Sequence, residues 1–409
     1  MKEIYLTSEM LDEAFEIRDR RIEKVRQATE TRRKMDRAKS QEEFEKISLP
    51  EEYKKFGEYG YQVMCSYVSG YSFRDNDAPK CFYGALGGPA DLLIPTLYRG
   101  EIRDYKETSG FSSLGREISK CNDDSGDEER FLLLLKAQMR IEIFAGFLSH
   151  FKQFREFPFA QPRPELIAQH YGLSTQFLDL TDDIKVAMFF ACCKRNEKNT
   201  GRANSFRSIT ENDIQEMGED GVLYMGIADA PCIGCQPFCR CHRQRGYYLD
   251  TTRNGICWSY SLAADEHFKK YYFKRTVALS KRLYEEFEGG AALFPQDNLS
   301  LFNEQINHIK STEVFPTQVF EDQFNALRKY LDGLICAGKI NNDLYAALCN
   351  KTYVRTRLES RGNQFQEQIQ IEFGKEKHKM LQNCNDNWNP TQYEEDEGIV
   401  YSPFVVIDK

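Results

Sequence analysis

The fold is decided by residues 166–191, which read LIAQHYGLSTQFLDLTDDIKVAMFFA. A polar cluster ends at Gly172, and the apolar run at residues 177–180 has the length of a short strand. Two acids, Asp182 and Asp183, then precede apolar residues at helical spacing. The stretch therefore predicts a loop, a strand, a turn and a helix in direct succession, and no other segment is so dense in chemically active side chains.

The turn after the strand is predicted to cap the helix. The Thr181 hydroxyl can accept a backbone N–H bond as the N-cap, and Asp182 and Asp183 would then lie in the first turn, where the helix dipole favours negative charge. Dipole complementation alone accounts for Asp183. Asp179 differs, because an unpaired charge inside an apolar strand is costly, so we expect it to have a dedicated partner such as an arginine or a set of backbone donors.

From this segment outward, the sequence predicts an α+β protein with a small mixed β-sheet core and packing helices. Residues 8–46 lack Gly and Pro, and we expect a helical extension over residues 1–60. The α+β core is placed at residues 61–300, with a central packing helix at about 128–157. A mostly helical region with a strand-like tail is expected over residues 301–409.

Composition and charge limit the kinds of partner that we expect. The chain has 409 residues, 41% hydrophobic residues and a formal charge of −8, which is typical of an acidic globular protein of two or three domains. This balance does not favour nucleic acid as a partner for the whole surface, although ten basic against four acidic residues between Arg18 and Lys39 could bind an anion or nucleic acid. No signal-peptide core and no bilayer-length apolar run is visible, so we expect a cytoplasmic protein without a membrane partner.

The thirteen cysteines include the cluster CIGCQPFCRCH, with Cys232, Cys235, Cys239 and Cys241. Cys-x-x-Cys is half of a zinc site, but the second pair follows too closely for the usual knuckle geometry. We therefore favour reduced thiols over zinc, with Cys257 as a further ligand should a metal bind.

Four motifs resemble the FRG domain family, a mostly bacterial family named for an aromatic-Arg-Gly motif. They are YRGE at residues 98–101, QHYGLSTQFLDLT at 169–181, RCHRQRGYY at 240–248 and LFPQD at 293–297. The resemblance covers about residues 98–300, with Tyr98 in place of the usual Phe. The family name implies no settled activity, so the residues must carry the functional argument.

The order of these motifs is also similar to that of the ADP-ribosyltransferases, which use NAD. In one branch of those enzymes an Arg on the first core strand anchors the cofactor, a Ser-Thr-Ser strand braces the site and a Glu on a later strand stabilises the ribosyl cation. Arg99 is similar to the anchoring Arg, and Ser174 and Thr175 are similar to the bracing strand. Gln244 stands where the Glu would come. A neutral Gln244 cannot stabilise a cation as a carboxylate does. Either another acid stabilises the ribosyl cation, or the fold binds a nucleotide without that catalysis.

The leading hypothesis is a nucleotide-binding protein that takes NAD as substrate, either ADP-ribosyltransferase-like or NAD-cleaving, acting as an effector or toxin in bacterial or phage conflict. The candidate catalytic residues are Glu101, His170, Asp179 and Asp182, and the candidate cofactor-binding residues are Arg99, Gln169, Tyr171, Ser174, Thr175, Arg240 and Gln244. An Arg99–Asp179 ion pair between core strands would explain both residues without any ligand.

Two other functions stay open. The first is a non-enzymatic module that recognises a small-molecule ligand, or a protein partner through the helical arms. The second is nucleic-acid binding or nuclease activity through the basic N-terminal helix. For the site itself, we expect Arg99, His170, Asp179 and Gln244 to lie around one cavity although they are far apart in the sequence.

Overall fold

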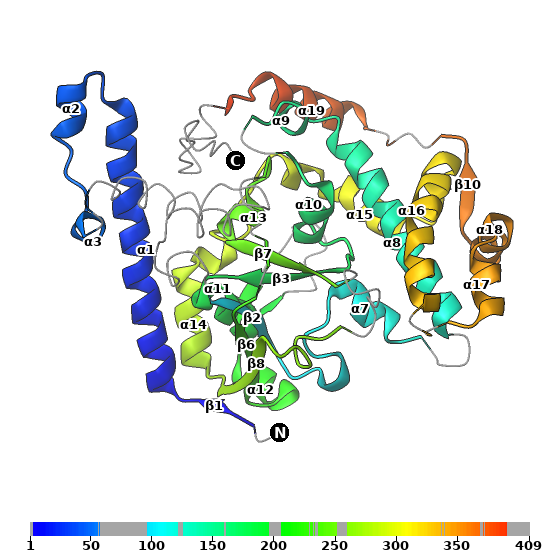
Figure 1. Cartoon of the computed structure of the whole chain (residues 1–409), viewed down its shortest axis with the longest axis horizontal. Coiled ribbons are helices and arrows are strands. Elements are labelled where there is room, and N and C mark those ends of the chain that lie inside the picture. Colours follow the sequence, from blue (N-terminus) through cyan, green and yellow to red (C-terminus); the bar gives the residue numbers. More distant parts are fainter. Residues whose placement is uncertain are drawn as a thin grey trace.

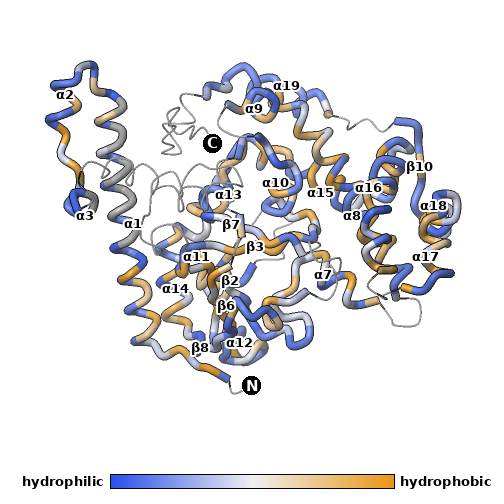
Figure 2. The backbone as a smooth tube through the Cα atoms, viewed as in Figure 1, coloured by the Kyte–Doolittle hydropathy of each residue, from blue (hydrophilic) through white to orange (hydrophobic). Residues whose placement is uncertain are grey.

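The computed structural model of the chain describes residues 3–55, 57, 96–121, 126–158, 161–195, 206–228, 230–231, 233, 236–251, 260–336, 338, 340–368, 371 and 373–390. Figure 1 shows a central β-sheet, the long helix α1 (Ser8–Arg37) along one side and most of the C-terminal helices on the other. The tube in Figure 2 is hydrophobic along the central strand β3 (Phe177–Thr181) and hydrophilic along the peripheral helix α19 (Lys375–Asp386).

The central sheet has six strands in the order β1-β8-β6-β2-β3-β7. These strands are β1 (Tyr5–Leu6), β8 (Phe268–Lys274), β6 (Asp220–Gly226), β2 (Leu97–Glu101), β3 and β7 (Gly246–Asp250). Only the β1–β8 pair is parallel, and the other neighbours in this sheet are antiparallel. The sheet is therefore mixed, which confirms the predicted α+β class.

Helix α11 (Ile184–Cys192) packs on one face of the sheet against β2. It is apolar and buried along nearly its whole length, and two small residues, Ala187 and Ala191, face β2. A Cβ atom added at Gly100 would lie 1.8 Å from the carbonyl oxygen of Ala187. The glycine of the YRGE motif is therefore required because the helix backbone lies directly on that strand.

The predicted cap of this helix is wrong by two residues. Thr181 is the last residue of β3 and pairs with Gly246 of β7, so the chain is still extended there. The N-cap is Asp183, whose carboxylate accepts a hydrogen bond of 2.9 Å from the backbone N–H of Lys185. Thr181 instead donates its hydroxyl to the carbonyl oxygen of Gln244 at 2.9 Å. Strand pairing thus overrides the local capping preference.

Helix α1 is a single helix of 30 residues, which confirms the predicted N-terminal helix. Its first turns bury Leu11 and Phe15 in the apolar cluster around α11. Arg18 donates through Nε to both carboxylate oxygens of Asp183 at 2.9 Å, and Lys185 reaches back to Asp19 at 2.9 Å. The start of α1 is therefore held against the start of α11.

A second apolar cluster lies between helix α8 (Gly126–Leu148) and the C-terminal helices. The predicted stripe of α8 is buried at all six positions, Phe131, Leu134, Leu135, Ile141, Phe144 and Phe147. This confirms the central packing helix, although it ends at Leu148 and the separate short helix α9 (Lys152–Arg155) follows, because the chain is extended at Phe151.

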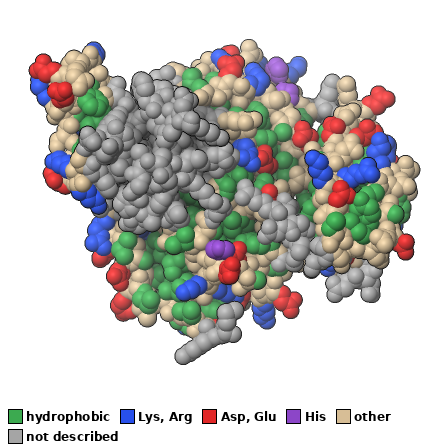
Figure 3. Space-filling model, in the orientation of Figure 1, with side chains coloured by type: hydrophobic (Ala, Val, Ile, Leu, Met, Phe, Trp, Pro, Cys, Tyr) green, Lys and Arg blue, Asp and Glu red, His purple; other side chains and the backbone are tan. Residues whose placement is uncertain are grey.

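The C-terminal helices are α15 (Asn303–Ser311), α16 (Thr317–Cys336), α17 (Asn342–Leu348), α18 (Lys351–Glu359) and α19. Figure 3 shows acidic and basic side chains interspersed over this side of the molecule on the face viewed. The helical content of this region agrees with the prediction. The domain division at residues 60 and 300 stays a prediction, and the strand-like tail lies outside the described residues.

Candidate functional site

A cavity of about 280 Å³ is lined by residues of the neighbouring antiparallel strands β2 and β3. Strand alternation places Arg99 and Glu101 on the same side of β2, and Asp179 on β3 also lines the space. Helix α10 (Pro164–His170) supplies His170, and Gln244 follows the short helix α13 (Arg240–Arg243). The expectation that Arg99, His170, Asp179 and Gln244 surround one cavity is confirmed.

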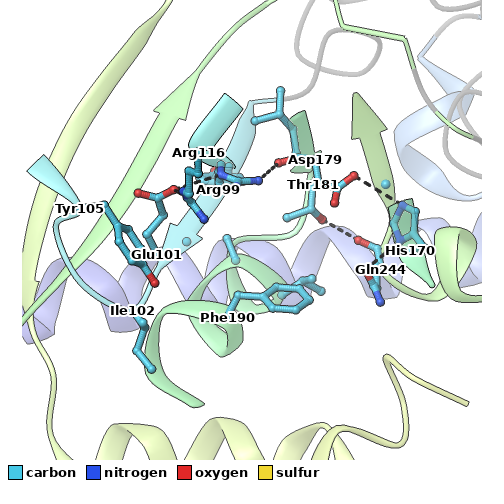
Figure 4. Close-up of a pocket in the computed structure, with 16 residues that line it drawn as sticks. Arg99, Glu101, Ile102, Tyr105, Arg116, His170, Asp179, Thr181, Phe190 and Gln244 are labelled. Carbon is cyan, nitrogen blue, oxygen red and sulfur yellow. Dashed lines mark hydrogen bonds and ion pairs between the residues drawn. The ribbon is translucent and has the colours of Figure 1, made fainter. Parts of the chain in front are cut away.

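Figure 4 shows two groups of polar side chains, which we call the arginine end and the histidine end of the cavity. The arginine end consists of Arg99, Glu101, Tyr105 and Arg116, and the histidine end of His170, Asp179 and Gln244. Phe190 of α11 and Ile102 add apolar surface. A polar contact at each end with apolar walls between is the usual arrangement of a small-molecule site.

At the arginine end, Glu101 is buried and accepts several hydrogen bonds. Its donors are the backbone N–H of Gly110 at 3.1 Å, the hydroxyl of Ser109 at 3.1 Å and the guanidinium of Arg116. The Arg99 guanidinium also approaches it, at 3.5 Å. Burial, and then the charge of Arg99, lower the pKa of Arg116. Two guanidinium groups thus share one carboxylate, which leaves this end suited to an anion.

Arg99 does not form the alternative ion pair with the Asp179 carboxylate. Its Nη1 donates to the backbone carbonyl oxygen of Asp179 at 2.9 Å, and its Nη2 to that of Phe111 at 3.4 Å. β2 and β3 pair only at Tyr98 and Thr181, so the Asp179 carbonyl is free to accept from a side chain. The structure therefore does not support the ion-pair alternative, because Arg99 substitutes for the missing strand hydrogen bonds.

Among the described residues, the Asp179 carboxylate has neither an arginine partner nor backbone donors. Its side chain is 39% exposed, and the nearest charged partner is His170, whose Nε2 lies 3.7 Å from the Asp179 Oδ1. The expectation of a dedicated partner assumed burial within an apolar strand, whereas Asp179 faces the cavity. Access to solvent replaces the need for a counter-ion.

Tyr171 and Arg240 lie behind the site and do not line the cavity. Both side chains are buried, with the Arg240 guanidinium 4.0 Å from the Tyr171 ring centroid. The Tyr171 hydroxyl donates to Asp297, and burial raises its pKa. Arg240 donates to the hydroxyl of Ser300 at 3.0 Å. These contacts join three of the motifs into a scaffold beneath His170.

Four other candidates also lie away from the cavity lining: Gln169, Ser174, Thr175 and Asp182. Gln169 donates to the carbonyl oxygen of Phe177 at 3.0 Å, and Ser174 donates to Glu117. Thr175 is fully buried before β3 begins. The structure therefore separates these side chains from the two ends of the cavity.

Asp182 is held by an arginine from the RCHRQRGYY motif. Arg245 donates to its two oxygens at 2.6 and 3.0 Å, and the Asp182 side chain is 1% exposed against 21% for Arg245. We expect Arg245→Ala to cost about 3 kcal/mol of unfolding free energy, because it leaves a buried carboxylate unpaired. Asp182→Ala should cost less, since Arg245 can reach water. Urea denaturation of both variants checks this order, and equal losses would contradict it.

The left-handed backbone conformation at Gly172 accounts for the glycine of the QHYG motif, and the half-buried Lys310 lies beside it. Gly172 has a φ of +87°, and a Cβ there would lie 2.8 Å from the Lys310 Nζ. Burial, and then the charges of Arg195 and Arg240, lower the pKa of Lys310 to about 8. Between pH 8 and the ordinary value of 10.5 the unfolded chain therefore binds more protons than the folded one.

The contribution of Lys310 to stability should accordingly rise with pH across that window. We expect Lys310→Met to raise the unfolding free energy at pH 7 by about 1 to 2 kcal/mol, because it removes a desolvated charge. The variant should also lose most of the rise between pH 8 and 10. Denaturation curves at these pH values measure both effects, and a variant as pH-dependent as wild type would refute the assignment.

Sequence reasoning missed three contributors to the site. Arg116 lies on α7 (Ser113–Ile118), and Tyr105 stacks under its guanidinium, with the Arg116 Cζ 4.5 Å from the ring centroid. The backbone carbonyl of Leu293 accepts a hydrogen bond of 3.0 Å from the Gln244 amide. The Ser112 cap could have revealed the helix, but no local pattern shows that it faces Arg99.

Half of the cysteine cluster is described. Cys239 and Cys241 are buried, and burial raises the pKa of Cys241. Cys232, Cys235 and Cys257 lie outside the described residues, so the preference for thiols over zinc stays a prediction. Within the described ranges, no group of three His, Cys, Asp or Glu side chains is placed to hold a metal ion. No helix in that part of the chain is long and apolar enough to cross a membrane.

The fold and cavity define an α+β protein whose candidate small-molecule site is lined by residues of three separated motifs. Residues 95–200 match the model of the FRG domain family, which confirms the resemblance seen in the motifs, and the chain therefore contains an FRG domain. No curated protein and no solved structure matches this chain.

Proposed function

We propose that the cavity binds a nucleotide with NAD as the substrate, and that the protein cleaves the bond between ribose C1′ and the nicotinamide nitrogen. The observation that carries the proposal is the division of the cavity into an arginine end and a histidine end. Two guanidinium groups that share one carboxylate suit a phosphate. An accessible carboxylate, Asp179, suits the cation that develops on a ribose during cleavage.

In the proposed reaction the electron pair of the C1′–N bond leaves with nicotinamide, which departs as a neutral base. The ribosyl cation is captured by water or by an acceptor hydroxyl, and the proton released from that nucleophile passes to Asp179 and then to solvent. Arg99 and Arg116 would hold the diphosphate. The cavity volume, about 280 Å³, lies near the lower limit of ligand sites, so it suits the ribosyl half of NAD with the remainder outside.

Loss of NAD would harm the cell that contains the active protein. This is the basis for proposing an effector role in bacterial or phage conflict. In this proposal Asp179 stabilises the ribosyl cation, which is the role that motif order alone would assign to position 244. Gln244 does not suit that role, because it is neutral and its side chain is hydrogen-bonded to His170 and Leu293.

A non-enzymatic recognition module is the second candidate. The state of Glu101 favours it, because this carboxylate is buried and engaged by backbone, hydroxyl and guanidinium donors and has a structural role already. The arginine end would then hold an anionic ligand without chemistry, and the helical arms would contact a protein partner.

One experiment separates these functions. Purified full-length protein is incubated with about 1 mM NAD, the upper end of common KM values, and nicotinamide is followed by chromatography while calorimetry records binding. We expect release of nicotinamide in a time-dependent manner. Binding without release would support the recognition module. A protein that neither binds NAD nor releases nicotinamide would overturn the proposal for NAD.

A further inference from the structure

The side-chain amide of Gln244 has one orientation fixed by its neighbours. Its Nε2 donates to the carbonyl oxygen of Leu293 at 3.0 Å, so Oε1 is the atom that lies 3.0 Å from the His170 Nδ1. The backbone is held as well, because the Thr181 hydroxyl donates to the Gln244 carbonyl oxygen. An amide oxygen only accepts, so the His170 Nδ1 must carry the proton of this hydrogen bond.

The other ring nitrogen then meets a second acceptor. In a neutral ring with Nδ1 protonated, Nε2 carries a lone pair, and it lies 3.7 Å from the Asp179 Oδ1. Both atoms are buried, and neither has a hydrogen-bond partner among the described residues. Two facing acceptors repel each other unless a proton lies between them, and a small movement of Asp179 would bring them within hydrogen-bond distance.

We propose that Gln244 is a positioning residue, which holds His170 with Nδ1 protonated so that His170 Nε2 and Asp179 Oδ1 share one proton. The pair then acts as a unit, in which His170 fixes the carboxylate by one oxygen and leaves the other for the ligand. Its effect on cleavage rests on the proposed function, whereas the protonation pattern does not. The chain of contacts runs from Leu293 to Gln244 and then through His170 to Asp179. Figure 4 shows the part from Gln244 to Asp179.

The protonation pattern is tested by NMR on full-length protein labelled with ¹⁵N-histidine. The chain has six histidines, and His170→Gln identifies the His170 ring signals by their loss. We expect Nδ1 to be protonated in wild type. In Gln244→Met, which keeps the side-chain length but removes the acceptor, Nδ1 should lose its proton, which leaves the ring with only the Nε2 proton beside Asp179. In Gln244→Glu, which retains an acceptor oxygen, Nδ1 should stay protonated.

An unprotonated Nδ1 in wild type, or identical His170 signals in wild type and Gln244→Met, would overturn the inference. If Gln244→Met fails to fold, the wild-type spectrum alone tests the inference, because it shows whether Nδ1 is protonated. A separate kinetic readout addresses catalysis: Gln244→Met should lower kcat for nicotinamide release about a hundredfold with KM within about twofold, since the variant misplaces a reacting group but leaves the arginine end intact. If wild type releases no nicotinamide, the proposed function fails while the NMR result still stands.

Discussion

Replacing Gly100 with alanine is expected to abolish folding. The added Cβ would lie 1.8 Å from the carbonyl oxygen of Ala187, 2.7 Å from its carbonyl carbon and 3.0 Å from the Ala191 Cβ. Overpacking in cores usually costs about 1 to 3 kcal/mol, when side chains can move aside. Here the contacts are backbone atoms of a buried helix, so α11 would have to leave β2. We expect a cost above about 5 kcal/mol, which is comparable to the whole stability of many domains.

Soluble yield and thermal unfolding measure this effect. Gly146→Ala is the matched control, because Gly146 lies in helix α8 and a Cβ there would have no atom within 4 Å. That variant should remain folded, with a stability change of no more than about 1 kcal/mol, because alanine favours a helix. A Gly100→Ala protein that melts like the Gly146→Ala control would show that α11 does not pack on β2 as described.

Asp179→Asn should lower kcat for nicotinamide release by about a thousandfold. Removal of one group that stabilises transition-state charge typically costs a factor of about 10² to 10³. The fold should survive, because the Asp179 side chain is 39% exposed and the new amide can donate to the His170 Nε2. We expect the unfolding free energy to stay within about 1 kcal/mol of wild type and KM to stay within a few-fold.

The exposed Asp343, at the start of α17, provides the control for this test. Asp343→Asn removes the same charge far from the cavity and should leave kcat unchanged. Steady-state kinetics with NAD, beside urea denaturation, measure both variants. Undiminished release by Asp179→Asn would show that Asp179 does not face the ribosyl cation, and the carboxylate would then have to be sought elsewhere.

Periodic patterns predicted the elements of this fold well. The stripe of α8 and the strand before Thr181 follow from spacing alone, because each pattern reports which side of one element is buried. The convergence of Arg99, His170 and Gln244 was also predictable, since polar residues in several short motifs exceed what packing requires.

Contacts between elements were not predictable in the same way. Arg99 meets the backbone of Asp179 because β2 and β3 diverge after one residue pair, and no local signal reports that divergence. Tyr171 was expected at the ligand, yet it lies under Arg240 because α10 and α13 pack together. Thr181 resembled a helix cap, but pairing with Gly246 kept it in the strand. Each error concerns which elements lie next to each other, and that arrangement is determined by the whole chain.

The strand order has a consequence for the timing of synthesis. β1 at Tyr5 pairs with β8 at Tyr272, and β6 lies between β8 and β2. A ribosome that adds about 5 to 20 residues per second needs roughly 13 to 53 s to travel between those two partners. During that interval β2 and β3 can form, but β6 lacks the strand that covers its outer edge until residue 274 has emerged. Nascent chains halted before that point would therefore present an open β-edge and depend on chaperones.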